Sequence, residues 1–114
     1  MGADNMSKQM TQKTELTLLY SLRATLHEME VALGLSDMTE LERSILEYIA
    51  FCQKNGQKVV SSELENQTLF KDISRASIFR ALKTLKASNR VYQETDSVDR
   101  RVKYLYPASE FAKS

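Results

Sequence analysis

Cysteine, proline and glycine are scarce in this chain of 114 residues, and each shortage excludes a class of structure. The single cysteine, Cys52, excludes an intramolecular disulfide and a zinc site built from several thiolates. One proline and three glycines leave no room for a long flexible linker. No apolar run approaches the roughly 18 residues of a membrane span, and the N-terminus lacks a signal-like apolar segment. We therefore expect one soluble, cytoplasmic globular domain without a membrane anchor.

Residues that carry out catalysis or bind metals are also few. His27 is the only histidine and has no partner at metal-site spacing, so we expect it to face solvent. Cys52 lies on the apolar side of an expected helix, where it is interpreted as a small buried hydrophobic residue. The sequence contains no glycine-rich phosphate loop and no local nucleophile–base pair. These features predict that the protein is not an enzyme and binds no metal or cofactor.

The two halves of the chain carry opposite net charge, although the whole chain has a formal charge of only +1. Residues 1–58 contain six basic and eight acidic residues, whereas residues 59–114 contain ten basic and seven acidic residues. Eight of these basic residues fall between positions 74 and 103, against three acidic residues. A basic segment of this kind is typical of a surface that binds an acidic partner such as nucleic acid.

The N-terminal part of the sequence predicts a flexible polar segment over residues 1–14, followed by an amphipathic helix over residues 15–34. Apolar residues recur there at alternating spacings of three and four, which places them on one seam of a helix that ends at Gly34. The residues of this seam are Leu19, Leu22, Leu26, Met29 and Leu33. The same spacing is typical of a coiled coil, so the seam is a candidate dimerisation element. The alternative is that it covers the core of the remaining chain.

A second amphipathic helix is expected before the Asn55-Gly56 pair, which stops the helical pattern. Its apolar stripe consists of Leu41, Ile45, Tyr48, Ile49 and Cys52. The polar residues that precede the stripe offer three N-cap candidates: Ser36, Asp37 and Thr39.

Two shorter helices are expected next. Ser62 and Glu65 have the spacing of a capping box, which predicts a short helix anchored by Leu64, Leu69 and Phe70. After a break at residues 71–73, Ser74 is the N-cap of a further helix that ends at Asn89. The apolar face of this last helix consists of Ile78, Leu82 and Leu85.

The period of the pattern changes from helical to alternating after Asn89. Residues 91–95 and 101–106 are rich in β-branched and aromatic side chains, and the residues between them are turn-like, which predicts a β-hairpin. Residues 58–60 are expected to pair with a later strand as an edge segment. The fold class is therefore mainly α with a small β-hairpin (α+β). The element order predicts a winged helix-turn-helix domain over residues 37–107, an extra N-terminal helix and a C-terminal tail over residues 108–114.

The last helix has an outward face that suits the major groove of DNA. At 100° per residue, Arg80 and Lys83 lie opposite the core residue Ile78. Small side chains let the helix enter the groove, and an arginine can donate two parallel hydrogen bonds to guanine. The candidate DNA-binding residues are Ser74, Arg75, Ala76, Ser77, Phe79, Arg80 and Lys83. The alternative is an ordinary solvated face.

The hairpin is a candidate wing because its tip is basic. Arg100, Arg101 and Lys103 are candidate contacts with the minor groove or with phosphates. Asp99 is expected to orient Arg101 through a bidentate pair. The alternative is that these charges protect an edge strand from aggregation.

Residues 73–85, followed by Asp99-Arg100-Arg101, resemble the MarR-type winged-helix regulators, and the similarity covers about residues 39–107. The resemblance implies that the serine-rich helix enters the major groove. It also implies that Asp99 and Arg101 form the Asp-x-Arg motif of the wing, which holds an arginine for the minor groove. Such proteins carry further C-terminal helices for dimerisation, so the sequence resembles a short form without them.

These observations predict a homodimeric transcriptional regulator that binds double-stranded DNA at a pseudo-palindromic operator. A replication or plasmid-maintenance initiator would use the same module. A winged-helix protein–protein interaction module, in which the basic face docks an acidic partner, is the alternative from another class. The sequence identifies no small-molecule effector.

Overall fold

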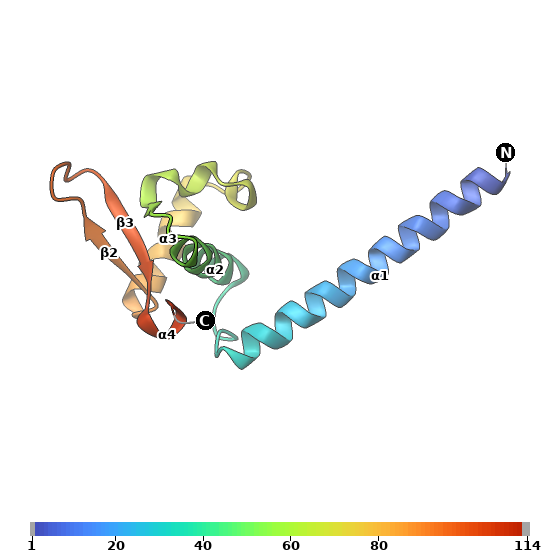
Figure 1. The fold of residues 1–114 in the computed structure, drawn as a ribbon, viewed down its shortest axis with the longest axis horizontal. Coiled ribbons are helices and arrows are strands. Elements are labelled where there is room, and N and C mark those ends of the chain that lie inside the picture. The colour runs from blue at the N-terminus through green and yellow to red at the C-terminus, as the bar shows by residue number, and fades with distance from the viewer. Residues whose placement is uncertain (1, 113–114) are drawn as a thin grey trace. The chain divides into compact units, whose positions relative to one another are not determined.

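The computed structural model describes the backbone of residues 2–112 and the side chains of residues 13–111. The chain forms two compact units, residues 1–37 and residues 38–114, and each is described by itself. Figure 1 labels the helices and strands of both units.

The first unit consists of one long helix, α1 (Gly2–Ala32). It ends where the sequence predicted: Gly34 has a positive φ of 76°, and its amide donates a hydrogen bond to the Val31 carbonyl. Helix α1 includes residues 2–14 of the segment for which the sequence predicted flexibility. This segment contains no proline, and its single glycine stands at the very start, so no residue in it breaks a helix.

The second unit begins with helix α2 (Glu40–Lys54), which has a complete capping box. Thr39 Oγ1 accepts a hydrogen bond from the Glu42 amide at 3.2 Å, and the Glu42 carboxylate accepts one from the Thr39 amide at 3.1 Å. Thr39 is therefore the N-cap among the three candidates. The buried residues of α2 are Ile45, Leu46, Ile49 and Cys52.

Helix α3 (Arg75–Ala87) begins and ends close to the predicted positions. Ser74 caps its start, because Ser74 Oγ accepts a hydrogen bond from the Ser77 amide at 3.1 Å. Beyond its end, Asn89 has a φ of 61°, a left-handed conformation that asparagine tolerates better than most residues. The buried residues of α3 are Ile78, Ala81, Leu82 and Leu85, which confirms the predicted apolar face.

A three-stranded antiparallel sheet of order β1-β3-β2 completes the unit. Strands β2 (Val91–Thr95) and β3 (Lys103–Pro107) form the predicted hairpin, and β1 (Val59–Val60) pairs with β3 at the expected edge. Strand β3 begins later than predicted, because the β2–β3 ladder ends at the Thr95–Lys103 pair. The hairpin tip therefore extends beyond the sheet and the helices of this unit (Figure 1).

The segment between β1 and α3 differs from the predicted capped helix. It forms two 3-10 turns, η1 (Ser61–Asn66) and η2 (Thr68–Phe70). The N-cap of η1 is Val60, which makes no side-chain capping bond, so the capping box predicted at Ser62 and Glu65 is wrong. Strand β1 runs directly into η1, so the apolar Val60 stands at the N-cap position. The predicted anchors Leu64 and Phe70 are buried, whereas Leu69 is 70% exposed.

The C-terminal tail expected over residues 108–114 includes a short helix, α4 (Ser109–Ala112). It packs against α2 and β3. The Ala108 amide donates a hydrogen bond to the Arg90 carbonyl at 2.8 Å, which joins this end of the chain to the start of the hairpin. The last helix of the second unit, α4, thus packs back against its first helix, α2.

Phe70→Ala is expected to lower the free energy of unfolding by about 3–5 kcal/mol, because it leaves a cavity in the core. Phe70 is 1% exposed, and its ring meets Tyr48 edge-to-face with centroids 5.9 Å apart. Denaturant unfolding of the full chain measures the change. Leu69→Ala, at the adjacent exposed position, is the control and should alter stability by less than about 0.5 kcal/mol. Similar losses for both variants would contradict the assignment of Phe70 as the core anchor.

Candidate nucleic-acid interface

Helix α3 presents a basic face on the side opposite its buried stripe. Ile78 and Leu82 are 1% and 2% exposed, whereas Arg80 and Lys83 face solvent. The other predicted contacts of this helix surround them: Ser74, Arg75, Ala76 and Phe79 are exposed, and Ser77 is half-buried. We call these seven residues the α3 face. Ala76, Arg80 and Lys83 lie opposite the buried stripe, and the other four residues lie around the first two turns of the helix.

Hydrogen bonds arrange the first two turns of the α3 face. The Ser74 hydroxyl donates to Ser77 Oγ at 2.8 Å. Arg80 Nη2 donates to the same Ser77 Oγ, and Arg80 Nε donates to the Ala76 carbonyl, both at 3.4 Å. Contacts of this length are weak, so they direct the guanidinium along the helix without locking it. The remaining N–H groups of Arg80 are available for a bidentate contact with a base.

Arg75 and Phe79 form a second pair on the α3 face. The Arg75 guanidinium carbon lies 5.3 Å from the centroid of the Phe79 ring, within the range of a cation–π contact. Phe79 remains 40% exposed beneath it. This contact limits the freedom of Arg75 and keeps an apolar ring edge at the surface, which suits a thymine methyl.

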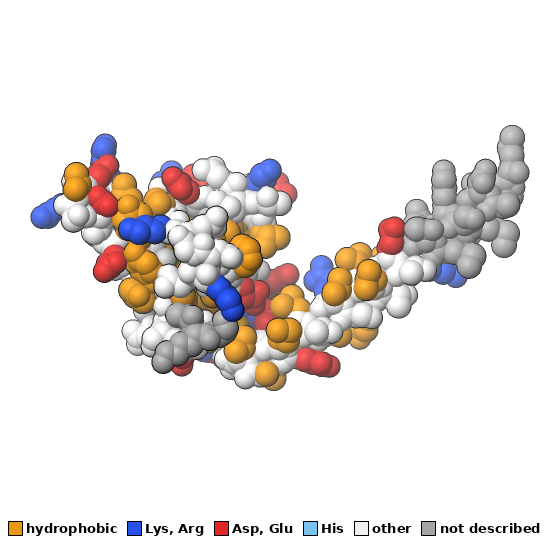
Figure 2. Space-filling view, in the orientation of Figure 1, with side chains coloured by type: hydrophobic (Ala, Val, Ile, Leu, Met, Phe, Trp, Pro, Cys, Tyr) orange, Lys and Arg blue, Asp and Glu red, His pale blue; other side chains and the backbone are white. Residues whose placement is uncertain are grey.

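In the wing, Asp99 and Arg101 form the predicted bidentate pair. Arg101 Nε donates to Asp99 Oδ1 at 3.1 Å, and Nη2 donates to Oδ2 at 3.3 Å. The Arg101 side chain, and then its backbone amide, hold the pKa of Asp99 below its usual range. The Arg101 side chain is 92% exposed, so the pair orients the guanidinium without burying its charge. Figure 2 shows basic side chains projecting at the hairpin end of the molecule.

The two other basic residues of the wing differ in exposure and in hydrogen bonding. Arg100 is exposed at the tip. Lys103 is half-buried at the start of β3, where Nζ donates a hydrogen bond to Thr95 Oγ1 at 3.1 Å. Arg100 and Lys103 line one shallow surface hollow together with Thr95, Asp96 and Ser97. The wing therefore presents an exposed arginine and a hydrogen-bonded lysine on the same surface.

Asp96 and Tyr104 are two wing residues that the sequence analysis did not single out. Asp96 Oδ2 accepts hydrogen bonds from the backbone amides of Val98 and Asp99, and Oδ1 accepts one from the Tyr104 hydroxyl. The turn at Asp96 could have been predicted from the sequence, because an aspartate at the start of a polar loop often accepts hydrogen bonds from the following backbone amides. The Tyr104 contact could not have been, since it joins the tip loop to a residue eight positions further along the chain, on β3.

No protein-family model and no curated protein sequence matches this chain. Solved structures of bacterial regulators resemble it. The adhesin competence repressor AdcR from Streptococcus pyogenes is 22% identical with a TM-score of 0.52, and the match covers 85% of this chain and 69% of that one. The fold is that of the MarR-type winged-helix regulators.

Two further structures with this MarR-type fold match over similar lengths. The MepR–DNA complex from S. aureus is 20% identical with a TM-score of 0.56, covering 82% of this chain and 67% of that one. The heme sensor protein PefR from Streptococcus agalactiae, in complex with heme, is 14% identical with a TM-score of 0.58, covering 89% and 65%. The chain thus spans about two thirds of the length of these proteins. The predicted winged-helix fold is confirmed.

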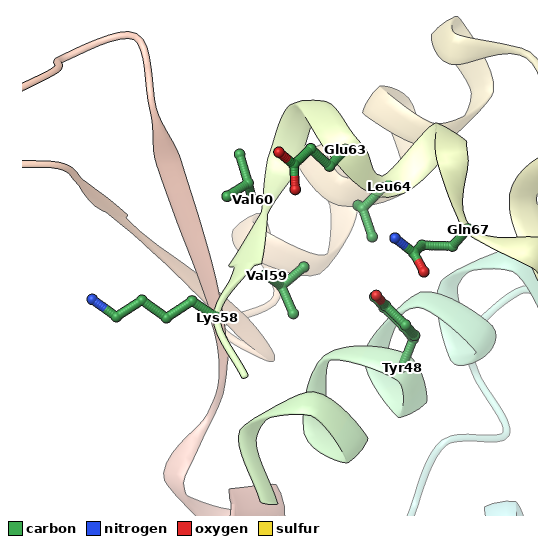
Figure 3. A pocket seen from close by; sticks show the side chains of 7 residues that line it. All are labelled: Tyr48, Lys58, Val59, Val60, Glu63, Leu64 and Gln67. Carbon is green, nitrogen blue, oxygen red and sulfur yellow. The ribbon is translucent and has the colours of Figure 1, made fainter. Parts of the chain in front are cut away.

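The second unit also contains a small pocket between α2, β1 and η1 (Figure 3). Its lining residues are Tyr48, Lys58, Val59, Val60, Glu63, Leu64 and Gln67. A volume of about 20 Å³ admits a water molecule and is too small for an organic effector. Burial, and then a hydrogen bond with Cys52, raises the pKa of Tyr48 to about 12, so its phenol is neutral at physiological pH.

The described side chains of this MarR-type fold include no cluster of three or more histidine, cysteine, aspartate or glutamate residues that could hold a metal ion. Cys52 is buried and His27 is exposed, both as predicted. In the described part of the chain, no helix combines the length and the apolar character needed to cross a membrane.

The first unit carries the candidate dimerisation seam on α1. Each of its five residues is between 47% and 59% exposed: Leu19, Leu22, Leu26, Met29 and Leu33. Leu16, Leu18 and Tyr20 add further exposed apolar surface to the same helix. Figure 2 shows hydrophobic side chains along the described part of α1. Apolar surface of this extent on one helix is typical of an interaction element.

Proposed function

We propose that the protein is a transcriptional regulator that binds double-stranded DNA in a sequence-specific manner as a homodimer. Helix α3 would lie in the major groove, and the wing would contact the minor groove. One observation carries the proposal: the same winged-helix unit exposes Arg80 on helix α3 and Arg100 and Arg101 at the tip of the wing. These are the two surfaces with which a winged helix contacts DNA.

Two further features support this function. MepR, a protein with the same fold, has been solved in complex with DNA. The apolar seam of α1 supplies a surface through which two copies can associate, and a two-fold dimer matches an operator with two symmetric half-sites. No catalytic activity is proposed.

Selection of bound duplexes from a random DNA pool tests this function with the full chain. We expect a two-fold symmetric motif whose half-site centres are separated by about 10 base pairs or a multiple of that spacing. Absence of binding to any duplex at low salt would contradict the proposal. It would favour the alternative in which the basic face docks an acidic protein partner.

Replacing both wing arginines, Arg100→Ala with Arg101→Ala, is expected to weaken binding to all duplexes and to reduce its salt dependence. Each lost phosphate contact should reduce the log–log slope of affinity against salt by about 0.9. If Arg101 enters a narrow minor groove, the loss will be larger on operators with A·T-rich flanks. Fluorescence anisotropy titrations across a salt series measure both quantities.

Arg23→Ala is the control for this experiment, because Arg23 is an exposed arginine on α1 outside the proposed interface. It removes a positive charge without removing a contact, so affinity and salt slope should stay close to those of the wild type. An unchanged slope in the double wing variant would show that the hairpin makes no contact with DNA.

A further inference from the structure

The tip of the wing lies beyond the part of the hairpin that the strands hold together. The last pair of the β2–β3 ladder is Thr95 with Lys103, so residues 96–102 have no strand partner. Two backbone hydrogen bonds cross this loop, from the Asp96 amide to the Val102 carbonyl and from the Val102 amide to the Asp99 carbonyl. A loop of this kind loses conformational entropy when a ligand orders it. Arg100 and Arg101 both lie on this loop. Their positions therefore depend on the side-chain contacts that hold the loop in addition to these two backbone hydrogen bonds.

Asp96 provides most of the additional restraint. Oδ2 accepts hydrogen bonds from the amides of Val98 and Asp99 at 3.0 and 2.8 Å, and these bonds close the turn at the tip. Oδ1 accepts a hydrogen bond from the Tyr104 hydroxyl at 3.0 Å. The amides of Asp99 and Val98, and then the Tyr104 hydroxyl, hold the pKa of Asp96 below its usual range. The carboxylate is therefore ionised at neutral pH, and both of its oxygens accept hydrogen bonds.

Tyr104 connects this turn to the body of the domain. It lies on the central strand β3, where it pairs with Val60 on one side and Glu94 on the other. The Lys58 ammonium group lies 4.7 Å from the centroid of the Tyr104 ring. The hydroxyl that binds Asp96 thus belongs to a residue whose strand is paired on both sides and whose ring lies against Lys58.

We propose that Asp96 and Tyr104 form a brace that positions Arg100 and Arg101 for DNA. The brace fixes the Asp99 amide, Asp99 in turn holds the Arg101 guanidinium, and Arg100 lies between these two residues. This inference rests on the proposed DNA-binding function and assigns Asp96 and Tyr104 as positioning residues. A loop ordered before it meets DNA loses less entropy on binding, which increases affinity.

The brace also removes an electrostatic conflict at the tip. Asp96 and Asp99 are two carboxylates beside a surface that would approach phosphates. All four of their oxygens accept hydrogen bonds from the loop, from Tyr104 or from Arg101. Each carboxylate oxygen is therefore already engaged within the wing, whereas the Arg101 guanidinium remains 92% exposed.

Tyr104→Phe tests the brace, because it deletes one hydroxyl and keeps the ring against Lys58. We expect operator affinity to fall by about 3- to 10-fold, the effect of one lost hydrogen bond. Tyr106→Phe is the matched control on the same strand, since its hydroxyl interacts with Glu94 rather than with the tip. It should change affinity by less than about 2-fold. Asp96→Asn, which keeps the shape and removes the charge, should weaken binding in the same direction as Tyr104→Phe.

A double-mutant cycle separates positioning from general structural damage. In the Arg100→Ala, Arg101→Ala background, Tyr104→Phe should cause almost no further loss of affinity, because the positioned groups are gone. Amide hydrogen exchange of the free protein gives an independent measure. Exchange at Val98 and Asp99 should accelerate in Tyr104→Phe and not in Tyr106→Phe.

Three results would overturn the inference. They are wild-type affinity in Tyr104→Phe, the same loss of affinity in both arginine backgrounds, and unchanged exchange at Val98 and Asp99. In each case the wild-type protein still binds DNA, so the proposed function stands. A wild-type protein that binds no duplex would instead overturn the proposed function, and this inference with it.

Discussion

Replacement of Leu22 and Leu26 by glutamate is expected to convert the proposed dimer into a monomer and to weaken operator binding by about 10²- to 10⁴-fold. The loss is large because a dimer presents its second winged-helix unit to the second half-site at a high effective concentration. A monomer binds each half-site independently and loses this advantage.

The physical basis of this expectation is the seam on α1. Leu22 and Leu26 are 58% and 47% exposed in the single chain. An isolated helix is marginally stable in water, and packing of its apolar face provides most of its stability. Burial of these leucines against a second copy would supply that packing, and two glutamates at the centre of the seam would prevent it.

Light scattering measures the mass in solution, which should be about twice the 13.1 kDa of one chain for the wild type. Thr17→Glu with Ser21→Glu is the matched control, because it adds the same charges at the same spacing on another side of α1. Both residues are exposed, and this variant should remain dimeric. Circular dichroism distinguishes a folded monomer from an unfolded chain. A wild type that stays monomeric at high micromolar concentration would remove the argument for a symmetric operator.

Arg80→Ala is expected to weaken binding to a selected operator by about 1–3 kcal/mol per protomer while changing non-specific affinity much less. Arg80 lies opposite the buried stripe of α3. The two hydrogen bonds that its guanidinium donates within the protein are weak, at 3.4 Å, so its donors are available to a base. The variant should also relax the preference at one base position in each half-site. Titrations on operator and scrambled duplexes at matched salt measure the difference.

Lys83→Ala is the comparison for Arg80→Ala. Lys83 lies further from the start of α3 on the same face, where we expect it to contact a phosphate and to affect both duplexes alike. Thermal melts of both variants should match the wild type, because both side chains are exposed. Equal losses for Arg80→Ala on the two duplexes would contradict a base contact. The specific role would then move to Arg75 and Ser77.

The helix boundaries and the hairpin of the second unit could be predicted because their causes are local. The caps at Thr39 and Ser74, and the left-handed Asn89, depend on residues within one turn of each helix. The change of period after Asn89 is equally local and predicts β2 and β3. The same holds for the bidentate pair in the wing, because Asp99 and Arg101 are two positions apart in the chain.

The segment from Ser61 to Phe70 could not be predicted correctly from these local rules. Ser62 and Glu65 have the spacing of a capping box, yet the neighbouring strand β1 and the buried Leu64 and Phe70 fix the backbone in two 3-10 turns. Tertiary packing outweighed a capping preference worth about 1 kcal/mol. For the same reason the Leu69 side chain is exposed to solvent, although its apolar character suggested an anchor.

The sequence by itself determined the winged-helix order of elements, the basic face of α3 and the basic tip of the hairpin, since each follows from short-range periodicity and charge. Only the tertiary structure decided how that tip is held. The contact between Asp96 and Tyr104 joins residues on opposite sides of the loop, and the Lys58 contact joins a third segment to it. Such contacts depend on strand register, which is set when β1, β2 and β3 pair and one face of the sheet is buried.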